Sequence, residues 1–246
     1  VGSEMCIRDS SLDDFYLGVE QMPVLPSGER DYETVNALDI ELVRACIRSV
    51  IDRGACMLPA YDFTTSERRL NARKLDLRGN GFVIMEGIHA LNPIFTKDLP
   101  EGSAIKLYVS VKQQIKDANG EVISPMDLRL IRRIARDVQF RNTSAERTLS
   151  MWPNVVAGED KYIRPYRMSA DYTVNSIHIY EPCVLRSSVI PLLRRIPEDS
   201  PHYRKARDLD ARLMRFEPVE PGLVPENSML REFLGPKAEK LSLIHI

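Results

Sequence analysis

The segment of residues 81–93, GFVIMEGIHALNP, constrains the fold of this chain more than any other part of the sequence. Its residues 82–85 form a short apolar run without a helical period, and the run lies between glycines and ends in a single carboxylate, Glu86. A short, continuous apolar run of this kind is typical of a buried parallel strand of an α/β sheet, because helices cover both faces of such a strand. Ligands of such sheets bind just outside the carboxyl ends of the strands. Glu86 is therefore a candidate for a metal or phosphate site, and the alternative is a carboxylate that only caps the next turn.

The two ends of the chain can be encoded by one DNA sequence in opposite orientations. Residues 5–10, MCIRDS, can be written ATG TGT ATA AGA GAC AGN. The reverse complement of the fixed bases, CTG TCT CTT ATA CAC AT, encodes LSLIHI, which is the sequence of residues 241–246. Such a pair is typical of a sequencing-library adapter, so we predict that residues 1–10 and 241–246 are adapter-derived and exclude them from the fold prediction. On this interpretation the natural sequence starts near Ser11, and the N-terminal part of the natural protein is missing.

The composition is that of an ordinary globular protein. Hydrophobic residues make up 43% and charged residues 28% of the 246 residues, a length that suits one α/β domain with a tail. The net charge of -1 gives no global basic field for nucleic acid or a membrane surface, and no apolar run approaches the length of a membrane span. Cys46, Cys56 and Cys183 have neither CxxC nor metal-ligand spacing. Such scattered cysteines are typical of the reduced core residues of a cytoplasmic protein, and the charge and the short apolar runs predict neither a membrane nor a nucleic-acid partner.

Strand and helix patterns alternate along the chain. We expect helices at residues 36–53, 126–140, 143–152 and 181–194, and strands at residues 55–59, 73–77, 82–86, 105–111 and 171–175. This alternation predicts an α/β domain with a mostly parallel sheet over residues 11–196. Residues 17–34 have no period and read as a long loop, which in a compact domain is usually functional or disordered. Two short helical patterns, at residues 202–215 and 226–234, predict a helical appendage over residues 197–240.

The helix predicted at residues 126–140 carries a stripe of basic side chains. Its arginines recur at i, i+3, i+4 and i+7, and they are Arg129, Arg132, Arg133 and Arg136. A planar guanidinium bonds two phosphate oxygens at once, so this stripe is a candidate anion site. The alternative is a solvated face that is partly neutralised by Asp127 and Asp137. Further arginines follow at 141 and 147 while the whole chain is nearly neutral, and this local asymmetry favours the phosphate interpretation.

Four motifs together resemble the uridine kinase and phosphoribulokinase family of P-loop kinases. They are SLDDFY at residues 11–16, PAYDFTTSERR at 59–69, MEGIHAL at 85–91 and DLRLIRRIARD at 127–137. Their order and spacing fit from Ser11 to about Leu193. The later segment VPENSMLREFLG, residues 224–235, is similar to a bacterial nucleoside (uridine) kinase branch. The resemblance implies a P-loop NTPase-type fold, with three α/β/α layers and a mostly parallel sheet, whose first strand and P-loop are missing here.

The resemblance also implies a role for each matching residue of an ATP-dependent nucleoside kinase. Asp13 matches the acid that accepts the proton of the nucleoside 5′-hydroxyl, and Glu86 matches the acid that helps to hold Mg²⁺. Arg129 matches a substrate-side arginine of catalytic importance. In the family, a helix leads into a lid that closes on the ATP phosphates and stabilises the transition state, and its arginines correspond to Arg132, Arg133 and Arg136. The aromatic residues that line the base pocket of the family correspond to Tyr16, Tyr32, Tyr61 and Phe63, although Phe63 could also be a core residue. Glu33 corresponds to the family acid that holds the ribose hydroxyls.

Two features of the sequence depart from the family pattern. It contains no G-x-x-x-x-G-K-[ST] motif and no Gly-Lys pair, for which truncation is the simplest explanation and a pseudokinase the alternative. Ser66 stands where uridine kinases commonly have a His that contacts the pyrimidine, which leaves the preferred base open. His89 follows Glu86 in a loop, and we expect it to be structural.

Three functions are consistent with these observations. The first is a nucleoside kinase of pyrimidine salvage that uses ATP and Mg²⁺ to make a 5′-monophosphate, most simply from uridine or cytidine, in a family whose members often form homo-oligomers. The second is a kinase for a sugar or sugar phosphate, which is disfavoured because Arg30 is the only cation in residues 11–33. The third is a non-catalytic nucleotide- or RNA-sensing module. We predict that the 246-residue chain itself is inactive as a kinase, because nothing in it would hold the β- and γ-phosphates.

Overall fold

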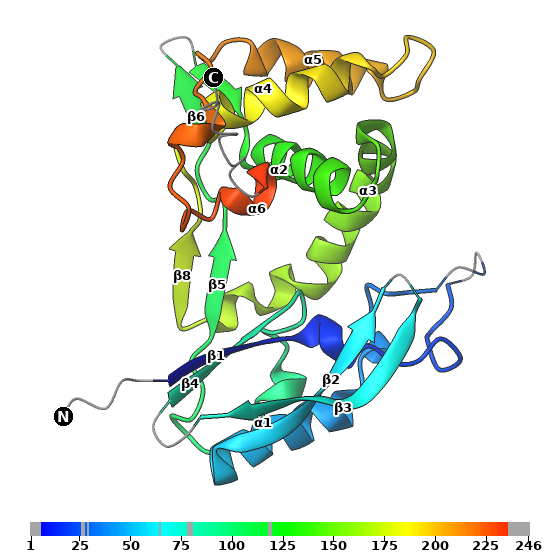
Figure 1. The fold of residues 1–246 in the computed structure, drawn as a ribbon, viewed down its shortest axis with the longest axis vertical. Helices are drawn as coiled ribbons and strands as arrows, with labels where there is room; N and C mark the ends of the chain where they lie inside the picture. The colour runs from blue at the N-terminus through cyan, green and yellow to red at the C-terminus, as the bar shows by residue number, and fades with distance from the viewer. Residues whose placement is uncertain are drawn as a thin grey trace, which may run out of the picture. The chain divides into compact units, whose positions relative to one another are not determined.

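A computed structural model describes residues 6–25, 28, 30–63, 65–77, 81–117 and 120–235 (Figure 1). The described residues form two compact units. Unit 1 contains the residues up to Tyr108 together with Val156–Thr173, and unit 2 contains Val109–Val155 and the residues from Val174 onward. Each unit is described by itself.

Two strand pairs form the sheets of unit 1. β1 (Cys6–Ser11) runs parallel to β4 (Gly81–Glu86), and β2 (Ala55–Asp62) pairs antiparallel with β3 (Glu67–Asp76). The β2–β3 register shifts next to Pro59, which has no N–H to donate to a ladder. Residues 6–10, which the sequence analysis excludes from the fold, form most of β1, because an extended segment that leads into the next turn can pair with the edge of β4. Their predicted adapter origin concerns the DNA and stays a prediction.

One long helix packs on this framework. α1 (Ile40–Arg53) begins at Asp39, whose side chain accepts a hydrogen bond from the N–H of Leu42 at 2.9 Å, and ends at Gly54, which has the left-handed φ of 70°. The core of unit 1 lies between α1, β2 and the SLDDFY segment, with Leu12, Phe15, Val43 and Leu58 almost fully buried. The short 3₁₀ helices are η1 (Leu12–Phe15), η2 (Val35–Ala37), η3 (Pro93–Phe95) and η4 (Arg164–Ser169).

Unit 2 is built mainly from helices. They are α2 (Pro125–Phe140), the first part of α3 (Ala145–Tyr162), α4 (Glu181–Arg194), α5 (Tyr203–Leu213) and α6 (Arg231–Leu234), with η5 (Pro221–Leu223). β6 (Ile115–Asp117) and β7 (Gly120–Ile123) form an antiparallel hairpin, and β5 (Leu107–Ser110) pairs with β8 (Tyr172–Asn175). A single apolar cluster joins α2, α4 and α5, and it includes Leu128, Ile131, Leu185 and Leu209. Ser124 caps α2 by accepting from the N–H of Asp127, and Pro125 follows at the first helical position.

The predicted α/β fold class is confirmed, and the helix at Glu181–Arg194 has its predicted bounds. Within the described residues the strands pair two by two, and β1 with β4 is a parallel pair. The expectation that residues 82–86 are buried on both faces is wrong, because Phe82 and Ile84 are 56% and 55% exposed. The same holds for the strand predicted at residues 105–111, where Leu107 and Val109 are 51% and 57% exposed. In the described part of the chain, these strands therefore carry apolar side chains on a face that nothing covers closely.

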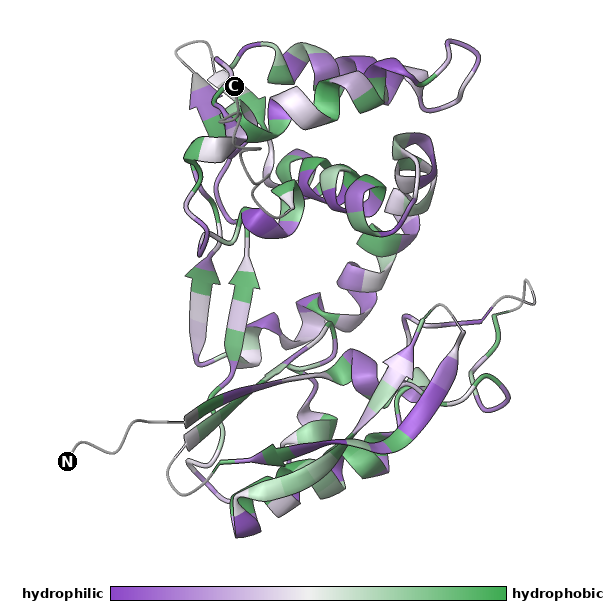
Figure 2. Cartoon of the chain, viewed as in Figure 1, coloured by the Kyte–Doolittle hydropathy of each residue, from purple (hydrophilic) through white to green (hydrophobic). Residues whose placement is uncertain are grey.

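The helices carry both apolar and polar residues along their length (Figure 2). Figure 2 shows apolar residues interspersed with polar residues along the helices, and β3 is hydrophilic over much of its length. Among the helices that the structure describes, none combines the length and the apolar character that crossing a membrane requires.

Candidate active site

The predicted site residues fall into two sets, one in each unit. Unit 1 holds those expected to contact the acceptor and the metal, which are Asp13, Tyr16, Tyr32, Glu33, Tyr61, Phe63 and Glu86. Unit 2 holds the predicted phosphate-binding arginines of α2, which are Arg129, Arg132, Arg133 and Arg136. The structure brings members of each set together, as the following contacts show.

The two acidic residues expected to carry the chemistry lie at the ends of paired parallel strands. Ser11 is opposite Glu86 in the β1–β4 register, so η1, which contains Asp13, starts at the same edge at which β4 ends. The Ser11 hydroxyl accepts a hydrogen bond from the N–H of Asp13 at 3.3 Å and so caps η1. The side chains of Asp13 and Glu86 are exposed. This edge therefore presents carboxylates to solvent, in the position where ligands of α/β sheets bind.

Gly87 lets the loop that follows Glu86 pass against η1. It has φ of 150°, and a Cβ built there would lie only 2.8 Å from the Cβ of Leu12. Any larger residue would push the loop away from η1, so the glycine fixes the proximity of the Glu86 and Asp13 segments.

Asp14 adds a further carboxylate to this edge. Burial raises the pKa of Asp14, the Arg73 guanidinium at 3.9 Å lowers it, and the negative charges of Glu86 and Asp9 raise it again. The acids at this edge therefore repel one another, and a bound cation would relieve that repulsion. Within the described residues no group of three or more His, Cys, Asp or Glu is arranged to hold a metal. Carboxylate oxygens such as those of Asp14 and Glu86 are ligands that suit Mg²⁺, which usually keeps several waters and binds through one or two carboxylates.

Four aromatic side chains gather next to η1. The Tyr16 ring centroid lies 5.6 Å from that of Tyr32, 5.5 Å from that of Tyr61 and 5.6 Å from that of Phe63. The Tyr16 hydroxyl donates to the main-chain carbonyl of Tyr32 at 2.9 Å and ties the long loop to η1. Burial, followed by the charges of Asp13 and Glu33, raises the pKa of Tyr16, which keeps the phenol neutral. Phe63 is 57% exposed, so it is not a core residue and offers an open ring face.

The Tyr61 hydroxyl is buried and has no hydrogen-bond partner among the described residues. Burial is the largest cause of its raised pKa, and the Tyr32 and Ser66 side chains lie close enough to influence that pKa without being in hydrogen-bonding geometry. A buried hydroxyl left unpaired is costly, so this atom marks a place where a polar ligand atom would be stabilised. Ser66, the residue that departs from the family pattern, has the positive φ of 57°.

Glu33 lies against the later part of α3. Its main-chain N–H donates to the Asp31 carboxylate at 3.1 Å, which closes a tight turn. A Cβ built on Gly158 of α3 would lie 3.1 Å from Oε2 of Glu33, so the carboxylate approaches the helix backbone closely. The helix predicted at residues 143–152 is shorter than α3 and does not include Gly158, although a glycine inside a helical pattern is a signal for such close packing.

Arg132 points into unit 2, and the expectation of four exposed guanidiniums on α2 is wrong for this residue. It is 8% exposed and forms two hydrogen bonds with the carboxylate of Glu181, of which the one from Nε measures 2.6 Å. It also donates to the carbonyl of Ser176 at 2.6 Å and lies 5.4 Å from the Phe233 ring. The α-helical spacing placed Arg132 correctly on the helix, but its partner lies in α4 and was not identifiable from that spacing.

The other arginines of α2 surround a buried carboxylate. Asp137 is nearly inaccessible, and it lies 3.2 Å from Nε of Arg133, 3.8 Å from Nε of Arg136 and 3.4 Å from a terminal nitrogen of Arg141. Arg136 also lies 3.3 Å from the Glu232 carboxylate, so two carboxylates face these three guanidiniums. Arg129 lies 6.0 Å from the Trp152 ring centroid. The alternative of partial neutralisation therefore holds for Asp137, whereas Asp127 is paired with Lys205 and Arg212 instead of the arginines of α2.

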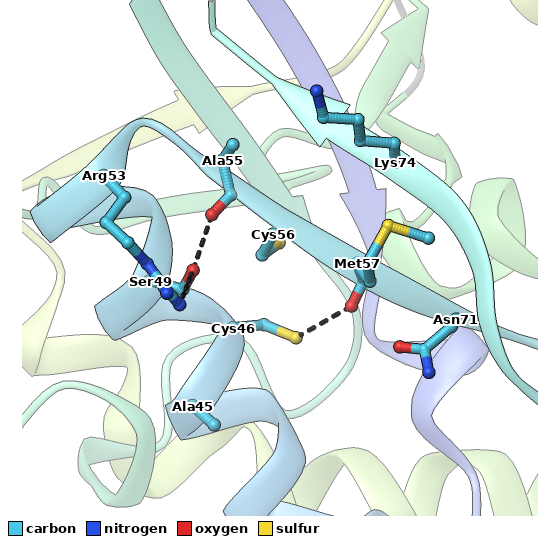
Figure 3. Close-up of a pocket in the computed structure, with 9 residues that line it drawn as sticks. All are labelled: Ala45, Cys46, Ser49, Arg53, Ala55, Cys56, Met57, Asn71 and Lys74. Atoms are coloured by element: carbon cyan, nitrogen blue, oxygen red, sulfur yellow. Dashed lines mark hydrogen bonds between the residues drawn. The ribbon is translucent and has the colours of Figure 1, made fainter.

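A cavity of about 510 Å³ lies elsewhere in unit 1, between α1 and the β2–β3 hairpin (Figure 3). The Cys46 thiol donates to the carbonyl of Met57, Ser49 donates to the carbonyl of Ala55, and Arg53 donates to Ser49. Burial, reinforced by the neighbouring Cys56, raises the pKa of Cys46 to about 12. These thiols are protonated at neutral pH and the polar groups named are already bonded, so the cavity lacks an activated nucleophile or base. We therefore do not place the active site there.

Known proteins match most of the chain. The sequence profile of the "Phosphoribulokinase / Uridine kinase family" matches residues 26–181, which include all the predicted site residues except Asp13 and Tyr16. A uridine kinase of Ureaplasma parvum serovar 3 is 28% identical over 163 residues, which are 66% of this chain and 70% of that protein. A uridine kinase of Clostridium botulinum (strain Kyoto / Type A2) is 27% identical over 172 residues, 70% of this chain and 75% of that protein. A uridine kinase of Saccharomyces cerevisiae is 28% identical over 174 residues, 68% of this chain and 30% of that protein.

Proposed function

Because the chain belongs to the phosphoribulokinase / uridine kinase family, whose fold is that of P-loop NTPases, we propose that it acts in an ATP-dependent nucleoside kinase. The reaction transfers the γ-phosphate of ATP to the 5′-hydroxyl of a nucleoside. The observation that carries this proposal is the aromatic cluster of Tyr16, Tyr61 and Phe63 beside Asp13, because an exposed ring face and a buried unpaired hydroxyl suit a nucleobase.

Each acidic residue at the strand ends has a separate role in this proposal. Asp13 accepts the proton of the attacking hydroxyl and orients it, since phosphoryl transfer depends mainly on positioning. Glu86 is the residue that would hold Mg²⁺, and that ion when bound neutralises phosphate charge. Glu33 holds ribose hydroxyls. Ser66 and the Tyr61 hydroxyl face the edge of the base and set its identity, which is uridine or cytidine in the simplest case.

The arginines of α2 divide into two groups. We assign Arg129, Arg133 and Arg136 to the phosphates, because the carboxylates of Asp137 and Glu232 face three guanidiniums and Arg129 lies on the same helix. Arg132 is committed to Glu181, so we assign it to fixing α2 on α4, in place of the direct phosphate contact that the family resemblance implies. The sugar-phosphate alternative would need additional cations near Asp13, where Arg73 is already engaged with Asp14.

A direct test compares the 246-residue chain with the product of any longer open reading frame that contains it. We would measure ATP- and Mg²⁺-dependent phosphorylation of uridine, cytidine, purine nucleosides and simple sugars. Turnover confined to nucleosides is expected, and turnover confined to sugars would contradict the proposal. The 246-residue chain alone is expected to be inactive, because its sequence contains no G-x-x-x-x-G-K-[ST] motif. No turnover by a longer chain that carries the motif would point to an acceptor outside this set, whereas no turnover by a longer chain that lacks it would favour a non-catalytic binding module.

The role of Asp13 is tested by Asp13→Asn in the active protein. We expect kcat to fall by about 10²- to 10⁴-fold, the usual contribution of a positioned general base, while ATP binding is retained. Asp52→Asn, at an exposed position in the last turn of α1, is the matched control and should leave kcat unchanged. An unchanged kcat for Asp13→Asn would remove Asp13 from the mechanism.

A further inference from the structure

Three segments of unit 1 meet around Glu33. They are the turn at residues 31–33, the loop after β4 that carries His89, and the last turns of α3, which carry Gly158 and Tyr162. The Glu33 carboxylate lies so close to α3 that a Cβ on Gly158 would be 3.1 Å from Oε2 and 3.7 Å from the carboxyl carbon. A contact at 3.1 Å is shorter than normal van der Waals separation, so an alanine at this position would displace the carboxylate by a few tenths of an ångström.

Gly158 is unusual for the local structure in which it lies. A glycine in a helix interior destabilises the helix by about 0.5–1 kcal/mol relative to alanine, because its backbone loses more freedom on folding. Nothing in the helical backbone requires it, since Gly158 does not have a positive φ. The close approach of Glu33 supplies a physical reason for its presence, since the Cβ of any other residue would require the carboxylate to move away by a few tenths of an ångström.

His89 lies beneath the same turn. It is 2% exposed, and its two ring nitrogens have no hydrogen-bond partner among the described residues. Its ring meets the edge of the Tyr162 ring at a centroid distance of 5.3 Å, one helical turn beyond Gly158. His89 therefore acts here as a packing residue between the turn and α3, and it helps to define how deep the turn sits.

We propose that Gly158 is a positioning residue that sets where the Glu33 carboxylate meets the sugar hydroxyls of the acceptor, with His89 and Tyr162 as the support beneath it. This proposal rests on the proposed nucleoside kinase function and deepens it. The last turns of α3, which carry Gly158 and Tyr162, determine how far the Glu33 carboxylate extends toward the acceptor. They thereby determine the affinity for an acceptor that carries vicinal ribose hydroxyls. Phosphoryl transfer itself occurs at Asp13, so the step governed by Gly158 is binding.

The test is a pair of substitutions in the active protein, measured singly and together. For Gly158→Ala we expect the KM for the preferred ribonucleoside to rise about 10-fold at nearly constant kcat, because a charge-assisted hydrogen bond is weakened before chemistry. Glu33→Asp shortens the acid by one methylene and withdraws it from α3. In the Glu33→Asp background, Gly158→Ala should therefore leave KM unchanged. Equal effects of Gly158→Ala in both backgrounds would overturn the proposal.

A second acceptor separates positioning from a general structural defect. With the 2′,3′-dideoxy form of the same nucleoside, which lacks the hydroxyls that Glu33 would hold, Gly158→Ala should not change KM. A 10-fold rise with this analogue as well would mean that the substitution distorts the site as a whole, against the proposal. Gly222→Ala is the matched control, since a Cβ there meets nothing within 4 Å, and it should leave both KM values unchanged.

Unfolding measurements distinguish this inference from the proposed function. The coupling between Gly158→Ala and Glu33→Asp can be measured in urea without any substrate. Coupled unfolding free energies with no nucleoside turnover would retain the contact but refute the nucleoside role. Turnover with additive free energies and additive KM effects would retain the kinase and refute the role of Gly158.

Discussion

The candidate acceptor site of unit 1 and the arginine cluster of unit 2 differ in how their charged groups are paired. Both hold buried polar atoms without a hydrogen-bond partner among the described residues, which in unit 2 include Nε of Arg136 and Oδ1 of Asp137. In unit 1, the Tyr61 hydroxyl and the His89 ring are buried without hydrogen-bond partners among the described residues, and Asp13 and Glu86 are exposed. In unit 2, Arg132 is bonded to Glu181, and Asp137 is surrounded by guanidiniums. The first region has polar atoms that a ligand could satisfy, whereas the second already uses much of its charge internally. A phosphate that binds to α2 must therefore compete with protein carboxylates.

The largest expected effect breaks the internal pairing of unit 2. Glu181→Ala leaves the Arg132 guanidinium buried without its counter-charge, and removal of one partner of a buried ion pair destabilises a protein by about 3–5 kcal/mol. The measurement is the free energy of unfolding in urea. Glu232→Ala is the control, since Glu232 is 55% exposed and its pair with Arg136 should contribute less than about 1 kcal/mol. Similar losses for the two variants would show that Arg132 is not held by Glu181.

The limits of prediction from sequence are clearest for this same residue. The spacing of apolar residues in 126–140 predicted α2 to within one residue, and the motif order predicted the family. Helical spacing also put Arg132 on one stripe with the other arginines. Whether it faces inward depends on Glu181, 49 residues further along, and such a contact leaves no periodic signal. Sequence thus determined the helix, and tertiary packing decided the direction of its side chains.

The end of α3 shows a second limit. The predicted helix stopped at residue 152, and the next residue is Pro153, a residue type that inside a helix removes a hydrogen bond and crowds the preceding turn. In the structure α3 continues through Pro153 to Tyr162. The later turns pack against Glu33 and His89, and such packing can outweigh an unfavourable local propensity. The contact between Gly158 and Glu33, on which the proposed positioning role rests, could therefore not be predicted from the local sequence around Gly158.

An intermediate effect sharpens the comparison within unit 1. Tyr16→Phe removes the hydrogen bond to the Tyr32 carbonyl and should destabilise the fold by about 0.5–1.5 kcal/mol. Tyr61→Phe removes a hydroxyl that has no partner in the described structure, so stability should be unchanged or slightly raised. Urea unfolding of both variants provides the measurement. If Tyr61→Phe is as destabilising as Tyr16→Phe, the Tyr61 hydroxyl is satisfied by the protein and is not reserved for a ligand.

The smallest expected effect is a change in the free energy of unfolding with pH. His89 of unit 1 and Asp127 of unit 2 should change it in different pH ranges. Burial lowers the pKa of His89 below its usual value near 6.5, and the Glu33 carbonyl and the Asp31 charge offset this only in part. The unfolded chain therefore takes up a proton at higher pH than the folded chain. Stability from neutral His89 is present above about pH 6.5 and is lost as the pH falls toward the folded pKa.

Asp127 of α2 responds in a lower range. Burial alone would raise its pKa, but hydrogen bonds from Lys205 and Ser124 and the charges of Lys205 and Arg212 outweigh burial and lower it below 3.8. Its contribution to stability is present above about pH 3.8 and is lost only as the pH falls through the folded pKa. His89→Leu should therefore flatten the decline in stability between pH 7 and 5, whereas Asp127→Asn should change only the decline at lower pH. Unfolding free energies measured from pH 7 to 3 test both, and an unaltered slope between pH 7 and 5 in His89→Leu would mean that this ring is not held neutral beneath Glu33.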